Sequence, residues 1–310
     1  MELRRDYFLD RWVIFAPGRG KRPRQVKKAS GPESSEACFF CKGNENMTPP
    51  EIGRDRPDWT IRWFPNKFPA VERKGSPEVK NSGRFFTHAS AYGSHEVVVE
   101  TPHHSKQLHN LSAGKLANVI GVYQERIASL QRGKSIKYVL VFKNYKAEAG
   151  TSIQHTHTQI VAYNKVPRLV EEEVKAARKF RGCPYCSIAR KEARGARFIG
   201  GNRSFVWFAP YASRFQYEVM ILPRKHLNSI TELNREGRHM LAEAMHGILK
   251  KLGSIDTPYN FFVHNAPKGK ELHFHVNICP RLSTWAGFEI GTDTIINTVL
   301  PEDAAKFYRK

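Results

Sequence analysis

The sequence lacks any run of about 18 consecutive apolar residues, so it predicts no membrane-spanning helix. Its first residues, Met-Glu-Leu-Arg-Arg-Asp, contain no apolar stretch of the kind that a secretory signal needs. Only five of the 310 residues are cysteine, and four of these stand in two Cys-x-x-Cys pairs. That arrangement is not the disulfide framework of a small secreted protein. We therefore expect a protein of the reducing cytoplasm whose paired cysteines bind metal.

Acidic residues are scarce. The chain has 50 Lys and Arg against 29 Asp and Glu, which gives a net charge of +21. Residues 19–28 hold the densest basic run, with six basic residues in ten. Such runs often bind nucleic acid, but the aromatic residues here are not spaced along a basic groove as stacking platforms. We therefore favour phosphate-bearing small molecules as partners and expect neither nucleic acid nor membrane.

The length suits two domains of ordinary size, each able to bury a core. Short strand-like runs dominate each half, and apolar residues at helical spacing predict one main helix at 113–130 and another at 235–252. This pattern indicates an α+β fold with two tandem domains, each an antiparallel sheet with helices packed on one face. A charged segment at 167–181 predicts an exposed connecting helix, which divides the chain into residues 1–168 and 169–310.

A cysteine and histidine pattern occurs twice along the chain. Each copy has a Cys-x-x-Cys pair, then a turn histidine, then a strand with the motif His-x-His. Two thiolates and two imidazoles are the ligand set of a closed tetrahedral zinc site. In the first turn His103 competes with His104 as ligand, and the internal alignment with His226 favours His104. The predicted zinc ligands are Cys38, Cys41, His104 and His155 at the first site, and Cys183, Cys186, His226 and His273 at the second.

Each copy also leaves one histidine over, two residues after the last ligand. In the first copy His157 and Gln159 share a strand face with the ligand His155, because residues i and i+2 of a strand point the same way. A histidine held in this way can act as a nucleophile. The preceding loop ends in Gly150 and Ser152, which offer donors to a phosphate, and the second copy lacks this loop. One active and one structural copy is the natural interpretation.

Five motifs in order resemble the galactose-1-phosphate uridylyltransferase family, a two-domain branch of the histidine-triad superfamily. They are the N-terminal loop at 16–23, the segment at 66–70, the turn at 102–106, the motif His155-Thr-His157-Thr-Gln159, and the tail that begins at 286. The resemblance runs nearly end to end. It implies that each domain is histidine-triad-like, and it assigns the turn ligand to His104.

The resemblance also implies a role for each matching residue. His157 is the nucleophile and Gln159 contacts the phosphoryl oxygens; Glu289 and Phe288 of the tail bind the sugar. The residues implied around the nucleotide are Arg19, Arg22, Asn66, Phe68, Asn144, Gly150 and Ser152. The implied reaction exchanges UMP between UDP-glucose and galactose 1-phosphate, with glucose 1-phosphate and UDP-galactose as products, in a homodimer. The duplicated cysteine and histidine pattern itself predicts two zinc ions per chain.

The sequence departs from the best-known members of that family in ways that keep two alternatives open. Thr156 stands between the two active-site histidines, where those members have proline. The presence of both Cys-x-x-Cys pairs resembles a sister group that phosphorolyses ADP-glucose, so an adenylyl-transferring ADP-sugar phosphorylase is the nearer alternative. A zinc-containing RNA-binding protein is the distant one.

Overall fold

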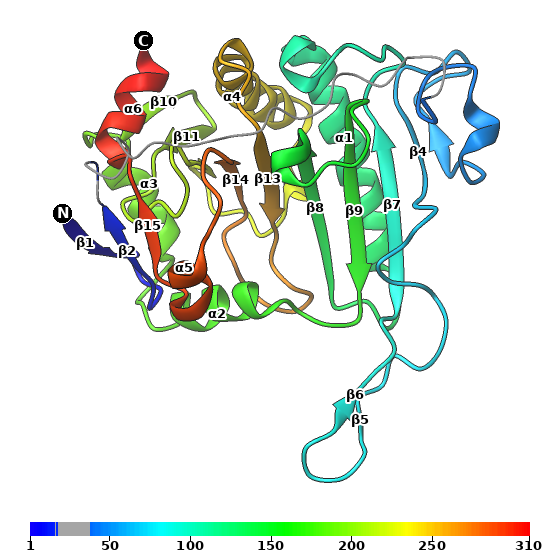
Figure 1. The fold of residues 1–310 in the computed structure, drawn as a ribbon, viewed down its shortest axis with the longest axis horizontal. Coiled ribbons are helices and arrows are strands. Elements are labelled where there is room, and N and C mark those ends of the chain that lie inside the picture. The colour runs from blue at the N-terminus through cyan, green and yellow to red at the C-terminus, as the bar shows by residue number, and fades with distance from the viewer. Residues whose placement is uncertain (16, 18–37) are drawn as a thin grey trace.

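The structure is a computed structural model that describes residues 1–15, 17 and 38–310. It is built on one ten-stranded sheet in which every ladder is antiparallel (Figure 1). In spatial order the strands are β10 (Phe198–Gly201), β11 (Phe205–Phe208), β12 (Val219–Pro223), β14 (His275–Pro280), β13 (Tyr259–His264), β8 (Tyr138–Tyr145), β9 (His157–Tyr163), β7 (Gly93–Val99), β4 (Arg62–Pro65) and β3 (Gly53–Arg54).

The internal duplication is visible in this order. The run β12-β14-β13 in one half mirrors β7-β9-β8 in the other, and the halves meet where β13 pairs with β8. Tyr145 opposes Tyr259 at one end of that ladder, and Val141 opposes Val263 at the other. The predicted division at residue 168 coincides with the start of the helix that follows β9, and it stays a prediction because sheet hydrogen bonds cross between the halves.

The main helix of each half covers the same face of the sheet. These helices are α1 (Ala113–Gln131) and α4 (Arg235–Ser254). Ser112 caps α1 by accepting a hydrogen bond from Lys115 N, and Asn234 caps α4 by accepting one from Gly237 N. Their apolar faces form one core with the strands, and each fully buried side chain there contributes roughly 1.5–3 kcal/mol. The structure confirms the α+β fold with antiparallel strands.

Two further helices pack on the opposite face of the second half. They are α2 (Arg168–Ala177) and α3 (Pro184–Glu192). With side chains of β11 and β12 that point away from α1 and α4, they form a second core. The expected connecting helix is therefore present, but it is not exposed throughout. Val170, Glu173 and Val174 lie on a buried face of α2, because the helix is amphipathic and turns that face to the sheet.

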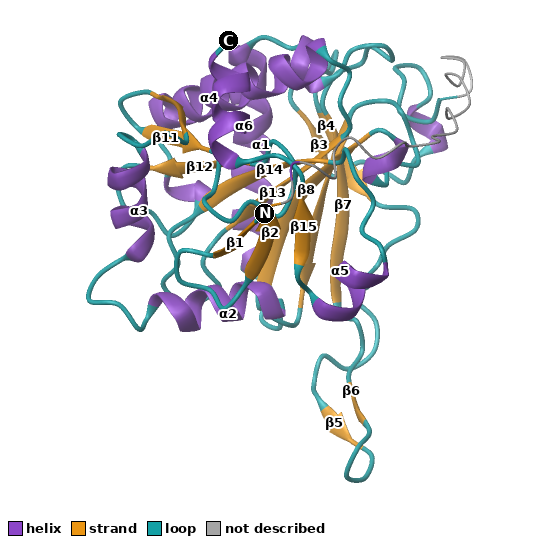
Figure 2. Cartoon of the chain, turned by 60° about the vertical axis from the view of Figure 1, so that its left-hand side comes forward, coloured by secondary structure: helices purple, strands orange, loops and turns teal. Residues whose placement is uncertain are grey.

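The two chain ends lie together. A small sheet contains β1 (Glu2–Arg5), β2 (Trp12–Phe15) and β15 (Ile295–Asn297), and Figure 2 shows the three strands side by side. The tail also has α5 (Gly287–Thr292) and α6 (Pro301–Arg309).

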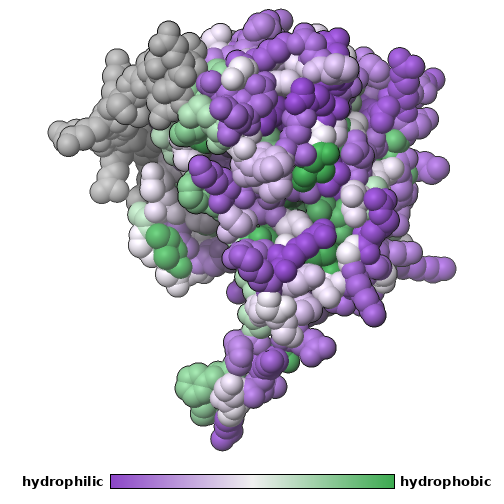
Figure 3. Space-filling model, turned by 90° about the vertical axis from the view of Figure 1, so that its right-hand side faces the viewer, coloured by the Kyte–Doolittle hydropathy of each residue, from purple (hydrophilic) through white to green (hydrophobic). Residues whose placement is uncertain are grey.

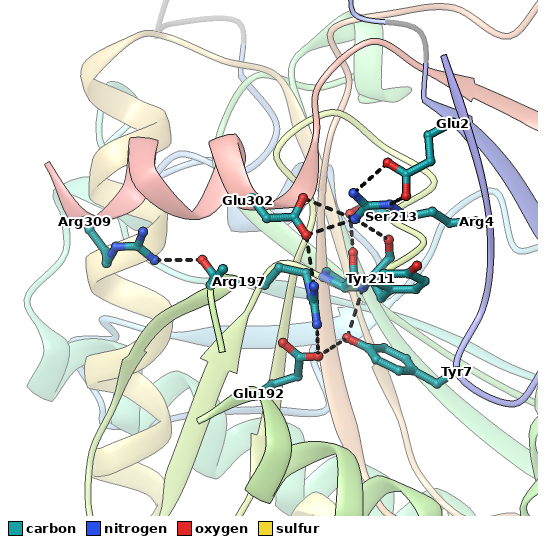
Figure 4. Close-up of polar contacts among 11 residues, drawn as sticks. Glu2, Arg4, Tyr7, Glu192, Arg197, Tyr211, Ser213, Glu302 and Arg309 are labelled. Atoms are coloured by element: carbon teal, nitrogen blue, oxygen red, sulfur yellow. Dashed lines mark hydrogen bonds and ion pairs between the residues drawn. The ribbon is translucent and has the colours of Figure 1, made fainter. Parts of the chain in front are cut away.

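Partly buried ion pairs fix this junction (Figure 4). Glu302 of α6 accepts hydrogen bonds from Arg4 at 3.0 Å and Arg197 at 2.9 Å. Glu192 of α3 then binds Arg197 at 2.7 Å and Tyr7 at 3.1 Å. The terminal segments are thereby tied to the second half of the sheet.

One hairpin projects from the body. It contains β5 (Lys80–Asn81) and β6 (Thr87–His88), and Figure 3 shows it standing clear with hydrophobic residues near its end. Phe85 and Phe86 at that end are 80% and 70% exposed. Among the described residues, no helix has the length and apolar character needed to cross a membrane.

Candidate active site and metal centres

The first cysteine and histidine group comes together next to the start of β9. His155 Nδ1 lies 3.7 Å from Cys38 Sγ and 3.5 Å from Cys41 Sγ, and His104 Nδ1 lies 3.4 Å from Cys41 Sγ. A tetrahedral zinc ion, with bonds of about 2.3 Å to sulfur and 2.0–2.1 Å to nitrogen, separates such atoms by about 3.6 Å. His104 belongs to this group and the neighbouring His103 does not. The four atoms therefore fit a closed metal site.

The second group repeats the first. His273 Nδ1 lies 3.6 Å from Cys183 Sγ and 3.4 Å from Cys186 Sγ, and His226 Nδ1 lies 3.9 Å from Cys186 Sγ. Burial, followed by the neighbouring Cys183, raises the pKa of the Cys186 thiol to about 11. A thiol with that pKa is a poor redox thiolate in the free protein, and a metal ion would have to displace its proton.

The outer nitrogens of the ligand histidines are also held alike. His155 Nε2 donates to Thr101 O at 2.7 Å, and His273 Nε2 donates to Pro223 O at 3.0 Å. These bonds leave Nδ1 free of a proton in the neutral ring, so it can bind a metal. Both groups could hold a metal ion with four protein ligands and no open position.

His157 lies at the start of β9 with one ring nitrogen fixed. Its Nδ1 donates to His155 O at 2.8 Å, so Nε2 carries the lone pair. The ring is 8% exposed and packs edge-on against Phe40 of the first metal knuckle, with centroids 5.1 Å apart. Burial, followed by the charge of Lys143, lowers the pKa of His157 to about 4. The side chain is therefore a neutral imidazole at physiological pH, as a nucleophile requires.

A buried polar network contacts the start of β9 on the sheet face that α1 covers. Lys143 Nζ on β8 donates to Glu100 Oε2 at 2.7 Å, to Thr156 Oγ1 at 2.8 Å and to His157 O at 2.8 Å. Thr156 Oγ1 in turn donates to Glu100 Oε2 at 2.6 Å, and Thr158 donates to the other carboxylate oxygen. Burial disfavours the charged carboxylate, but Lys143 and these hydrogen bonds hold the pKa of Glu100 below its usual value. The backbone of His157 is thus anchored by a buried ion pair.

Gln159 lies on the same face as His157 and contacts a residue that the sequence did not suggest. Its Oε1 is 2.8 Å from His95 Nε2 on β7, and Asn66 Nδ2 is 3.2 Å from the same nitrogen. His95 opposes Val161 in the β7–β9 ladder, so it is a diagonal neighbour of Gln159. The structure therefore links the predicted phosphoryl contact with the predicted nucleotide segment.

Two hollows lie on either side of β9, and their lining comes from the strands next to it. One, of about 180 Å³, is lined by Phe39, Phe40, Phe64, Asn66 and Phe68 among others. The second is larger, about 510 Å³, and opens where the two half-sheets meet. It is lined by Phe142 and Asn144 from the first half and by Phe262 from the second. Together the hollows offer an aromatic pocket and a wide groove on either side of β9.

The glycine loop adjoins the larger hollow. Asn144 Nδ2 lies 3.4 Å from Gly150 O, and Gly150 has φ +90°, a left-handed conformation that glycine adopts without strain. Asn144 Oδ1 also accepts from Asn260 Nδ2 at 2.8 Å. Ser152 is exposed beside this loop. Arg19 and Arg22 lie outside the described residues.

The predicted sugar residues do not join this constellation within one chain. Glu289 and Phe288 lie on α5, which packs against β15 (Figure 1), and neither residue lines the two hollows beside β9. Glu289 Oε2 accepts a hydrogen bond from Ala286 N at 3.0 Å, at the start of its own helix. Phe288 is 47% exposed. No hydrogen bond or ion pair in the described part of the chain joins Glu289 to the residues around His157.

Sequence reasoning missed a group of residues that the structure places at or near the histidine strands. Lys143 and Glu100 are charged residues within apolar strand runs, and that anomaly was the available signal. Glu173, His264 and His275 form a third buried group with ligand-type atoms within 4.8 Å of one another. Their partnership had no local signal, because it joins α2 to β13 and β14.

Comparison with known proteins identifies the family to which the chain belongs. A family profile described as the galactose-1-phosphate uridyl transferase N-terminal domain matches residues 1–167, and its C-terminal counterpart matches residues 139–291. The chain belongs to the galactose-1-phosphate uridyl transferase family.

Relatives in this family carry two different names. An ADP-glucose phosphorylase of Arabidopsis thaliana is 34% identical over 100% of this chain and 92% of its own length. A galactose-1-phosphate uridylyltransferase of Thermotoga maritima is 29% identical over 100% of this chain and 98% of its own. Among solved structures, the Arabidopsis ADP-glucose phosphorylase with bound ADP-glucose superposes with a TM-score of 0.86 at 31% identity, covering 100% of this chain and 98% of that one.

Proposed function

We propose that the protein is a UDP-glucose–hexose-1-phosphate uridylyltransferase of galactose metabolism that works by double displacement at His157. The observation that carries the proposal is the geometry of that histidine. Its Nδ1 is bound to His155 O at 2.8 Å, which leaves Nε2 as the attacking atom beside Gln159. Family membership supports uridylyl transfer, as the sequence predicted.

The first step transfers the uridylyl group to the protein. Nε2 of His157 attacks the α-phosphorus of UDP-glucose, a phosphorus–nitrogen bond forms, and the bond to the bridging oxygen breaks. Its electron pair leaves with glucose 1-phosphate. The attached ring gains positive charge, and Nδ1–H donating to His155 O stabilises that charge. Galactose 1-phosphate then attacks the same phosphorus and leaves as UDP-galactose, so one difficult displacement becomes two easier ones.

The residues around His157 would supply positioning and charge stabilisation. The amide of Gln159 donates to the phosphoryl oxygens, and the loop of Gly150 and Ser152 offers further donors. The hollow lined by Phe64, Asn66 and Phe68 has the aromatic walls that suit a nucleobase. Asn144 lines the adjoining groove, and Arg19 and Arg22 remain proposed phosphate contacts.

We further propose two zinc ions per chain, one in each cysteine and histidine group. The sulfur and nitrogen separations of 3.4 to 3.9 Å and the mixed ligand set support zinc. Four protein ligands leave no open position, so the metal would supply rigidity to the strands. The paired thiols also support a location in the reducing cytoplasm.

A homodimer would complete the sugar site. Glu289 and Phe288 line neither hollow of their own chain, and the groove of about 510 Å³ beside Asn144 is open to a partner. We propose that a second copy brings its Glu289 to this groove, where an ionised carboxylate accepts hydrogen bonds from sugar hydroxyls. Glu289→Gln should then impair the sugar-dependent steps and leave UMP affinity nearly intact; an equal loss of both would contradict this role.

A second candidate has specific support. The Arabidopsis relative named ADP-glucose phosphorylase matches this chain at 34% identity and a TM-score of 0.86. In that case the attached group would be adenylyl and inorganic phosphate would be the second substrate. The histidine chemistry would be unchanged, because both reactions pass through a nucleotidyl-histidine. RNA binding is the least supported alternative, since it makes no use of His157 or Gln159.

One experiment separates these candidates. The purified protein is incubated with UDP-glucose or ADP-glucose labelled at the α-phosphorus, and protein-bound label is counted. We expect label from UDP-glucose, released as UDP-galactose on addition of galactose 1-phosphate. Label from ADP-glucose that inorganic phosphate releases as ADP would establish the second candidate. Absence of bound label from both would contradict nucleotidyl transfer.

A further inference from the structure

His95 is a buried residue that lies between the segment at 66–70 and Gln159. It lies on β7, is 8% exposed, and its two ring nitrogens face different partners. Nδ1 lies 3.1 Å from the backbone N of Ala70, and Nε2 lies 2.8 Å from Gln159 Oε1. One nitrogen thus contacts the nucleotide segment at 66–70, and the other contacts the predicted phosphoryl ligand.

The contact with Ala70 determines where the proton of His95 lies. A backbone N–H can only donate, so Nδ1 must accept and carries no proton. A neutral imidazole has one proton, which is therefore on Nε2. Burial lowers the pKa of His95, which favours this neutral form, although the hydrogen bond to Gln159 opposes the shift. The neighbouring backbone thereby sets the tautomer.

The tautomer then determines the orientation of Gln159. Nε2–H must donate, and Gln159 Oε1 is the acceptor at 2.8 Å. Asn66 Nδ2 lies 3.2 Å away, but it is itself a donor, because Asn66 Oδ1 accepts from Phe68 N at 2.9 Å. The oxygen of the Gln159 amide is consequently occupied, and its NH₂ group is the end left for a ligand.

We propose that His95 is a positioning residue that holds the Gln159 amide with its NH₂ group toward the phosphoryl oxygens. The role rests on the proposed nucleotidyl transfer at His157. An unrestrained amide can rotate by half a turn and present its oxygen, which would repel the charge that develops on the phosphoryl group. Donors already oriented toward that charge need no reorganisation during reaction. His95 also joins the nucleotide segment to the phosphoryl contact.

Two substitutions separate the two hydrogen bonds. His95→Asn keeps an acceptor near the Nδ1 position for Ala70 N but cannot reach Gln159. His95→Gln places an amide donor near the Nε2 position and loses the acceptor for Ala70. The measurements are the single-turnover rate of nucleotidyl-His157 formation and, separately, the affinity for UMP.

Loss of an oriented donor to a reacting group costs about 10²–10³-fold in rate. We therefore expect His95→Asn to lower the rate by about tenfold to hundredfold and to keep the affinity for UMP within about threefold of the wild type. His95→Gln should recover at least part of that rate.

The decisive control is the substitution His95→Asn in a protein that lacks the Gln159 amide. In a Gln159→Ala background, His95→Asn should lower the rate by no more than about threefold, because the group that it orients is gone. An equal loss in both backgrounds would overturn the proposal. So would a loss of UMP affinity as large as the loss of rate, or no advantage of His95→Gln over His95→Asn.

The protonation state of His95 can be measured by NMR without any enzymatic reaction, so this test does not depend on the proposed function. In ¹⁵N-histidine-labelled protein at pH 7, the His95 ring should be neutral with its proton on Nε2, and Gln159→Ala should shift that signal. A proton on Nδ1, or a charged ring, would overturn the tautomer argument whatever the enzyme does. Failure of wild-type protein to form the adduct would instead contradict the proposed function.

Discussion

The two His-x-His strands share their bonds but not their surroundings. In β9, His157 Nδ1 donates to His155 O at 2.8 Å; in β14, His275 Nδ1 donates to His273 O at 3.0 Å. Each strand also begins beside a group of two cysteines and two histidines. The metal group and the ring orientation are therefore common scaffold, and they do not by themselves distinguish a nucleophile from a structural histidine.

The space in front of each ring differs. His157 keeps 8% of its surface exposed and has Gln159 two residues on. His275 is fully buried, packs on Tyr185 with ring centroids 4.9 Å apart, and lies 3.9 Å from Glu173. Helices α2 and α3 cover the second strand, so no phosphoryl group can reach His275 without displacing them.

The support behind each strand differs as well. Thr156 and Thr158 face a buried polar network, whereas their counterparts Phe274 and Val276 face the apolar core. A buried ion pair is weak evidence for stability, because the cost of removing charges from water can exceed the attraction between them. Its presence behind the first strand alone, among the described residues, fits a need to position His157.

The sharpest way to break this comparison is to remove each ring in turn. His157→Gly should abolish nucleotidyl transfer by a factor on the order of 10⁴ or more, since the nucleophile is gone. His275→Gly should leave the rate of the folded protein within about tenfold. Initial rates on protein checked for folding by circular dichroism give both values. Comparable losses in the two variants would show that His275 also takes part in the chemistry.

Removal of the metal tests the shared part of the scaffold. We expect elemental analysis of the wild type to find two zinc ions per chain, and chelation to lower the melting temperature sharply, because metal binding is coupled to folding. Cys38→Ser with Cys41→Ser should lose one ion and all transfer activity. Cys183→Ser with Cys186→Ser should lose the other ion and destabilise mainly the second half. A wild type with a single ion would show that the two groups are not equivalent.

The buried ion pair allows a finer test. Lys143→Met leaves Glu100 without its cation and should cost about 3–5 kcal/mol of stability, as the loss of one buried partner does. Lys143→Met combined with Glu100→Gln should recover much of that stability, because no uncompensated charge remains. The transfer rate should stay low in both, since His157 O has lost its donor. Urea unfolding and single-turnover rates check the two halves of this prediction, and full recovery of rate in the double variant would contradict it.

The smallest effect concerns a buried carboxyl in the second half. Burial raises the pKa of Glu218 to about 7, although its hydrogen bonds from Phe215 N and Arg214 N oppose the shift. The folded state therefore holds a proton that the unfolded state releases above its ordinary pKa of 4.5. Stability should fall as the pH rises from about 4.5 to about 7, and then level off, a contribution of about 3 kcal/mol for this group.

Glu218→Gln supplies the matched control. It should remove this part of the pH dependence and raise the melting temperature at pH 8, where the wild type carries a buried charge. Melting curves between pH 5 and 8 give the comparison. A variant whose melting temperature follows that of the wild type across the range would show that Glu218 does not carry this pH dependence.

The sequence predicted those features that depend on rare residue types in a repeated order. Cys-x-x-Cys and His-x-His can be located without tertiary information, and the structure brings both predicted metal groups together. Long-range backbone pairing could not be predicted in the same way. The β8–β13 ladder that merges the halves, and the buried face of α2, depend on contacts between segments far apart in the chain. His95 was missed for the same reason, because only the sheet register places it beside Gln159.

The central claim is that the first strand carries the nucleophile and the second does not. Wild-type protein is incubated with UDP-glucose, digested with protease, and the modified peptide is sequenced by mass spectrometry under mildly basic conditions, which preserve a phosphorus–nitrogen bond. We predict one uridylyl group, on His157, that acid removes. A uridylyl group on His275 or on any other residue, or one that survives acid, would contradict the account.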